Sequence, residues 1–201
     1  MADVRKVLTW GVLCLLAVLC GASPASATSA SGSLLKLTDL PAGWVSVKSP
    51  VAGPRPPCLA AAEAPLARFP QGKVADVGEN DHLAQLTERV ISVPRSILRA
   101  RYSDVVRRFT ACNGSSWTRG PTFRLFITNR AAPPPGHFRT SSFSVTIRSP
   151  STNVVPNPYL GLVDFAAVGT KVVVLSMQFA GVPVDGATFG SVEARAVARA
   201  A

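Results

Sequence analysis

The sequence has few of the side chains that carry most enzymatic chemistry. Its 201 residues include only two histidines, His82 and His137, which stand far apart and in no metal-ligand spacing. It has no G-x-S-x-G turn, no glycine-rich phosphate loop and no dinucleotide fingerprint. We therefore predict no catalytic residue, no metal and no cofactor, and we assign neither histidine a role. A hydrolase built from paired carboxylates stays open, because sequence alone does not reveal which acids converge.

Acidic residues are scarce too, with 11 Asp and Glu against 21 Lys and Arg. The surplus of positive charge suits an anionic partner, such as an acidic protein, an acidic polymer or lipid headgroups. A basic composition that serves solubility alone explains the same numbers. Nucleic acid is not expected as a partner, because the N-terminus directs the protein out of the cytoplasm.

Long apolar runs are absent except at the N-terminus. Arg5 and Lys6 precede the apolar stretch 7–22, and the small residues of Ala25-Ser26-Ala27 follow it. This order is that of a signal peptide, and the apolar stretch is too short for a comfortable membrane span. We predict cleavage after Ala27 and no transmembrane segment once the leader is removed.

Lipid anchoring at Cys20 is an alternative fate for the leader. A lipobox has a small residue directly before the cysteine and usually leucine three residues before it, whereas this chain has Leu19 and Ala17. The secreted, soluble form is therefore preferred over a lipoprotein.

Cysteine is rare as well, and the leader holds two of the four. Cys58 and Cys112 remain, which is an even number in an oxidising compartment. The expected outcome is one disulfide between them, spanning 54 residues.

The most regular pattern in the chain is helical and covers 94–112, beginning at a proline. Six residues fall within one stripe of this helix: Leu98, Tyr102, Val105, Val106, Phe109 and Cys112. The disulfide should therefore lie against the core. Asp104 stands among arginines on the flank of this helix, and we interpret that cluster as a solvated ion cluster.

Alternating segments predict strands over 86–93, 122–128 and 141–149 and a hairpin that turns at 168–170. We also predict a short helix from Cys58 interrupted near Pro65, a polar loop over 71–81 and a closing helix capped by Asp185 or Thr188. Phe189, Val192 and Ala196 should face inward. The class is α+β.

In order along the chain stand "LLKLTDLPAGW", Cys58 after a proline-rich loop, and "LTERVISVPRSILRARYSDVVRRFTAC". Trp117, "FAAVGTKVVVLSMQF" and a final helix after "VDG" follow. In this order the chain resembles the PknH-like sensor domain family of actinobacteria, which includes extracellular domains of kinases and stand-alone secreted proteins. "LTDLPAGW" resembles the family's lead-in, which docks a tryptophan. Gly136-His137 stands where an acidic residue is expected, and the helix is richer in arginine.

The resemblance implies a curved antiparallel sheet packed against two main helices, in a single domain with one disulfide. The expected organisation is a signal peptide over 1–27, a flexible mature N-terminus over 28–33 and the sensor-type domain over 34–201. The implied cleft would suit a small molecule, lipid or glycan of the cell envelope, with no catalytic residues to transfer. The leading hypothesis is a secreted, non-enzymatic ligand-binding protein, and the second is a protein–protein interaction module with a basic face. The sequence does not identify the ligand-binding residues.

Overall fold

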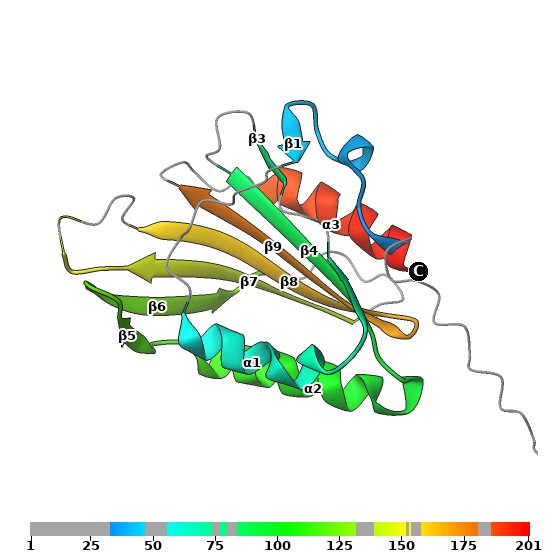
Figure 1. Ribbon diagram of the computed structural model, residues 1–201, viewed down its shortest axis with the longest axis horizontal. Coiled ribbons are helices and arrows are strands. Elements are labelled where there is room, and N and C mark those ends of the chain that lie inside the picture. Colours follow the sequence, from blue (N-terminus) through cyan, green and yellow to red (C-terminus); the bar gives the residue numbers. More distant parts are fainter. Residues whose placement is uncertain are drawn as a thin grey trace, which may run out of the picture.

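The structure is a computed structural model, which describes residues 33–46, 56–73, 77–79, 84–131, 139–151, 153, 158–180 and 186–201. These residues form one antiparallel sheet with helices on both faces (Figure 1). The helices are α1 (Pro57–Ala67), α2 (Arg95–Ala111) and α3 (Gly186–Ala200), with a 3₁₀ turn at Leu37–Asp39. Among these helices, none has the length and apolarity that a membrane crossing requires.

The sheet has nine strands, in the order β1-β3-β4-β9-β8-β7-β6-β5, with β2 also paired to β4. The strands are β1 (Trp44–Ser46), β2 (Gln71–Lys73), β3 (Val77–Glu79), β4 (Ala84–Ser92), β5 (Ser116–Thr118), β6 (Thr122–Asn129), β7 (Arg139–Arg148), β8 (Tyr159–Val168) and β9 (Lys171–Ala180). Every pairing is antiparallel. The α+β class and the antiparallel sheet packed against helices are confirmed.

The core forms two layers because the central strands are apolar on both faces. On β9, Val173 and Leu175 pack under α3, whereas Val172 and Val174 pack under α2. Successive side chains of a strand point to opposite faces, so a continuous run of valines buries both. The predicted hairpin is present, and Gly169 makes its turn with a φ of +58° that favours glycine.

Helix α2 confirms the predicted stripe. Tyr102, Val105, Phe109 and Cys112 are buried, and the rings of Phe109 and Phe143 lie 5.0 Å apart. The disulfide joins Cys58 at the start of α1 to Cys112 at the end of α2. As a result α1 packs against α2 more than against the sheet.

Three local predictions need correction. The predicted loop over 71–81 contains β2 and β3, because backbone hydrogen bonds to the edge of the sheet organise even a polar segment. Helix α1 continues through Pro65 to Ala67. Thr188 is not the cap of the closing helix, because that helix already begins at Gly186, and Asp185 lies outside the described residues. The inward positions of the closing helix, such as Phe189, are confirmed.

Candidate functional site

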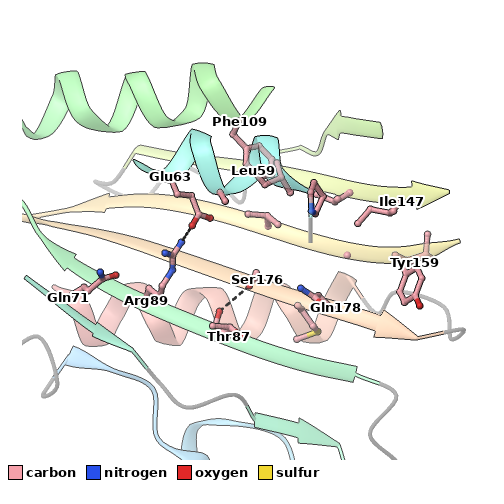
Figure 2. Close-up of a pocket in the computed structure, with 17 residues that line it drawn as sticks. Leu59, Glu63, Gln71, Thr87, Arg89, Phe109, Ile147, Tyr159, Ser176 and Gln178 are labelled. Atoms are coloured by element: carbon pink, nitrogen blue, oxygen red, sulfur yellow. Dashed lines mark hydrogen bonds and ion pairs between the residues drawn. The ribbon is translucent and has the colours of Figure 1, made fainter. Parts of the chain in front are cut away.

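A pocket of about 580 Å³ lies between α1, the end of α2 and the sheet (Figure 2). It is lined by Pro56, Leu59, Ala60, Glu63, Gln71, Thr87, Arg89, Phe109, Val145, Ile147, Tyr159, Leu160, Gly161, Val163, Ser176, Met177 and Gln178. Its volume is within the usual 300–1,000 Å³ of small-molecule sites. The pocket exists because the disulfide holds α1 beside α2, so α1 overhangs the sheet instead of lying flat on it.

The floor of the pocket follows from strand alternation and register. Thr87 of β4 stands opposite Ser176 of β9, which stands opposite Val163 of β8. The neighbouring row on the same face runs from Gln178 through Gly161 to Val145 of β7. Antiparallel pairing thus places residues from four strands side by side. The Ser176 hydroxyl donates to the Thr87 carbonyl oxygen at 3.5 Å.

Each of these two rows changes from polar to apolar across the sheet. In these rows β4 and β9 supply Thr87, Ser176 and Gln178, whereas β7 and β8 supply Val145 and Val163. Ile147 of β7 and Tyr159 of β8 extend the second side. Gly161 contributes no side chain, so the backbone itself forms the floor where the two halves meet. One face of the sheet therefore offers hydrogen-bonding groups at one side and hydrocarbon at the other.

The wall above the polar side is α1. Glu63 of α1 forms an ion pair with Arg89 of β4, as Figure 2 shows, and about a quarter of each side chain is exposed. Leu59 of the same helix presents an apolar side chain to the pocket. The ion pair joins the disulfide-linked helix to the sheet directly at the pocket.

The ionisable side chains of this pocket are few. Among its lining residues Glu63 is the one carboxyl group, and Arg89 pairs with it. Hydrolysis of glycosides needs two carboxyl groups about 5–10 Å apart. The described residues contain no group of three or more His, Cys, Asp or Glu that could hold a metal ion.

A pair of carboxyl groups does exist, but on the opposite face of the sheet. Asp164 of β8 and Glu193 of α3 interact beneath α3, with 2% and 4% of their surfaces exposed. Burial raises the pKa of both, that of Glu193 to about 8, because a charged carboxylate loses its hydration there. The Arg130 guanidinium lies 3.6 Å from Asp164 and over the Phe189 ring. Both carboxyl groups are therefore buried under α3, on the face of the sheet opposite the pocket.

Glu88 of β4 is fully buried on the same face. Its Oε2 accepts the Leu35 N–H at 2.7 Å, which connects the N-terminal segment to the sheet. Burial raises the pKa of Glu88 to about 7. Asp39 of the same segment forms a bidentate ion pair with Arg199 of α3, and that guanidinium lowers the pKa of Asp39.

The aromatic residues singled out in the sequence belong to the packing. Trp44 is buried in the core beneath α3 and ends the lead-in segment as predicted. The Tyr102 hydroxyl, inside the other layer, hydrogen-bonds Ser141 at 2.7 Å. Trp117 stacks on Phe123 with ring centroids 5.4 Å apart.

Other predicted site residues lie outside the described part of the chain. These are the cleavage site at Ala27, the alternative anchor Cys20 and the two histidines, His82 and His137. Cleavage after Ala27 stays a prediction.

The sequence analysis did not identify the charged residues of the pocket or the buried acidic residues on the opposite face. Arg89 and Glu63 belong to different elements, and their separation along the sequence does not indicate that they form an ion pair. Asp164 gave a usable signal, because an acid within the apolar run of β8 must find a buried partner. The burial of Glu88 was harder to predict, and the indication was that it shares a strand face with the apolar residues Leu86 and Val90.

The fold has a known counterpart. The extracellular domain of PknH from Mycobacterium tuberculosis matches the chain with a TM-score of 0.56 and 14% sequence identity, covering 90% of this chain and 98% of that one. The likeness is one of fold. The match confirms the predicted resemblance to a PknH-like sensor domain at the level of the fold.

The Mll3558 protein from Rhizobium loti matches with a TM-score of 0.32 and 18% identity, over 65% of this chain and 95% of that one, which is too low to indicate a shared fold. The sequence matches no protein-family model and no curated protein.

Proposed function

We propose that the protein is a secreted, non-enzymatic ligand-binding protein of the cell envelope and a stand-alone member of the PknH-like sensor family. The observation that carries this proposal is the 580 Å³ pocket on the α1 and α2 side of the sheet, which is mostly apolar and has its polar side chains gathered at one side. A signal-peptide pattern and the Cys58–Cys112 disulfide support an extracytoplasmic location. The ligand would be a small molecule, a lipid or a glycan.

The test is native mass spectrometry on protein secreted from the full chain into an oxidising compartment of an actinobacterial host. We expect an N-terminus at residue 28 and a discrete extra mass that organic solvent releases. Val163→Trp, which places an indole on the floor of the pocket, should abolish the extra mass. Thr128→Trp is the matched control, because Thr128 lies exposed on β6 away from the pocket. An extra mass that survives Val163→Trp would contradict the assignment of this pocket.

An interaction surface is the second candidate, and one observation favours it. Arg124 of β6 stands directly opposite Arg148 of β7, although like charges across a sheet repel each other. Both guanidinium groups lie 5.7 Å from the ring of Phe126, which is 37% exposed. An acidic partner protein would relieve the repulsion and cover the ring.

The second candidate predicts salt-sensitive cross-linking of the secreted protein to an acidic envelope protein. Arg124→Ser together with Arg148→Ser should abolish the cross-link, while Val163→Trp should leave it intact. A cross-link that persists in the double variant at high salt would rule out this surface.

A further inference from the structure

The pocket specifies more about its ligand than its size. The inference below rests on the proposed function, because it assumes that the pocket is the binding site. The decisive feature is the direction of the polarity change, which runs across the strands and not along them. On the β9 side stand Ser176 and Gln178, and on the β7 side stand Val145 and Ile147.

The polar side offers donors and acceptors together. The Gln178 amide provides both, and Gln71 of β2, the short strand paired to β4, provides another amide. The Arg89 guanidinium adds donors and the Glu63 carboxylate adds acceptors. Mixed donors and acceptors suit hydroxyl and amide groups, which themselves both donate and accept.

The charges of the lining cancel. Glu63 and Arg89 are its two charged residues, and they pair with each other. A ligand with a net charge would have to separate this pair or bring an unmatched charge into a partly enclosed site, which is unfavourable. An uncharged head can hydrogen-bond to both partners without separating them.

The other side is mainly apolar, and the lining residue there that carries a polar group is Tyr159 of β8, opposite Ile147. Val145, Ile147 and Val163 form the floor there, and Leu59 of α1 lies above them. A hydroxyl placed against these side chains would lose its hydration without finding a partner. A hydrocarbon segment would instead replace water that contacts four apolar side chains.

We propose that the ligand is an uncharged amphiphile, with its hydroxyl- or amide-bearing head at Glu63, Arg89 and Gln178 and its hydrocarbon end over β7 and β8. A volume of 580 Å³ equals that of about 20 water molecules at ~30 Å³ each. A single sugar ring with a short alkyl chain, about 20 non-hydrogen atoms in all, has a suitable size.

The test is isothermal titration calorimetry on protein secreted from the full chain, stripped of any bound material with solvent and refolded with its disulfide intact. The probes share one tail and differ in the charge of the head: octyl β-glucoside, octyl phosphate and octyltrimethylammonium, each below its micelle concentration. Free glucose tests the head alone. We expect octyl glucoside to bind at least tenfold more tightly than either charged probe and than glucose.

Two single variants test the charge argument independently. Glu63→Gln leaves Arg89 unpaired, so octyl phosphate should gain at least tenfold relative to octyl glucoside. Arg89→Gln leaves Glu63 unpaired, so octyltrimethylammonium should gain instead. A merely structural role of the ion pair would weaken all three probes together. Gln178→Leu should weaken octyl glucoside at least fivefold, whereas Asn129→Leu at the exposed end of β6 should not.

The outcomes separate this inference from the proposed function. If a charged probe binds the unmodified protein as well as or better than octyl glucoside, and Val163→Trp blocks that binding, the ligand class is wrong while the pocket remains a binding site. If no probe binds and the secreted protein has no extra mass, both proposals are wrong. Tight binding of octyl glucoside, blocked by Val163→Trp, with the two opposite changes in selectivity supports both.

Discussion

Glu88 makes the stability of this protein depend on pH in a direction opposite to that of a carboxylate in an ion pair. It lies fully buried between β4 and the N-terminal segment, and the Leu35 N–H is its hydrogen-bond donor. Burial raises the pKa from the 4.5 of an exposed glutamate to about 7, because the charged form loses hydration. The folded protein therefore holds a proton that the unfolded chain releases.

The sign follows from proton counting. Below pH 4.5 the group is protonated in both states and contributes its full stability. As the pH rises from 4.5 to about 7, the unfolded chain binds fewer protons than the folded one, so the free energy of unfolding falls. At ~1.36 kcal/mol per pKa unit the loss is about 3 kcal/mol, and it levels off above the folded pKa.

Glu88→Gln removes this titration and keeps an acceptor for the Leu35 N–H. Relative to the unmodified protein, the variant should gain about 3 kcal/mol between pH 4 and pH 8. At about 2–4 °C per kcal/mol, the difference in Tm should grow by roughly 6–12 °C over that range. Urea unfolding at each pH, followed by tryptophan fluorescence, measures the difference in the free energy of unfolding, and thermal unfolding measures the difference in Tm. Asp164 and Glu193 titrate in the same direction, but they are present in both proteins, so the difference isolates Glu88.

Asp104→Asn is the control, because the contribution of Asp104 to stability should depend on pH in the opposite direction. Arg108 and Arg107 hydrogen-bond the Asp104 carboxylate and lower its pKa, so its contribution is present at neutral pH and lost as the pH falls. Its removal should reduce stability at pH 7, and this reduction should shrink as the pH falls below 3.8 and through the lowered pKa. If the unmodified protein and Glu88→Gln show parallel stability curves from pH 4 to pH 8, Glu88 is already charged in the folded state and the reasoning fails.

Three further perturbations test the packing. Replacing Cys58 and Cys112 by serine should cost about 4 kcal/mol, the loop-closure value for a 54-residue separation, and an unchanged urea midpoint would contradict this. Asp39→Asn removes the ion pair with Arg199 and should cost about 1 kcal/mol in low salt and less in 1 M salt; equal losses in both would argue against an electrostatic origin. Phe109→Ala should cost roughly 3–5 kcal/mol in thermal unfolding, because the ring is fully buried, and a loss below 1 kcal/mol would show that the site collapses.

Much of the fold was predictable because its signals are local. The helix stripe from Leu98 to Cys112 and the alternation of Phe143, Val145 and Ile147 depend on the periods of helix and strand alone. The lead-in that buries Trp44 was predictable from its apolar residues and its Leu-Pro and Gly turn residues. The same local reasoning failed over 71–81, where the sheet edge supplied the order that the sequence lacks.

The α+β class, the strand faces and the pair of cysteines could be predicted from the amino-acid sequence, since each depends on neighbours along the chain or on residue counts. Tertiary structure alone decided the site. Glu63 meets Arg89 only because the disulfide holds α1 over β4, and Val145 shares a floor with Gln178 only through the register of three strands. It also decided that Asp164 and Glu193 share one buried environment. Long-range pairing brings these side chains together, and no spacing within a single segment encodes it.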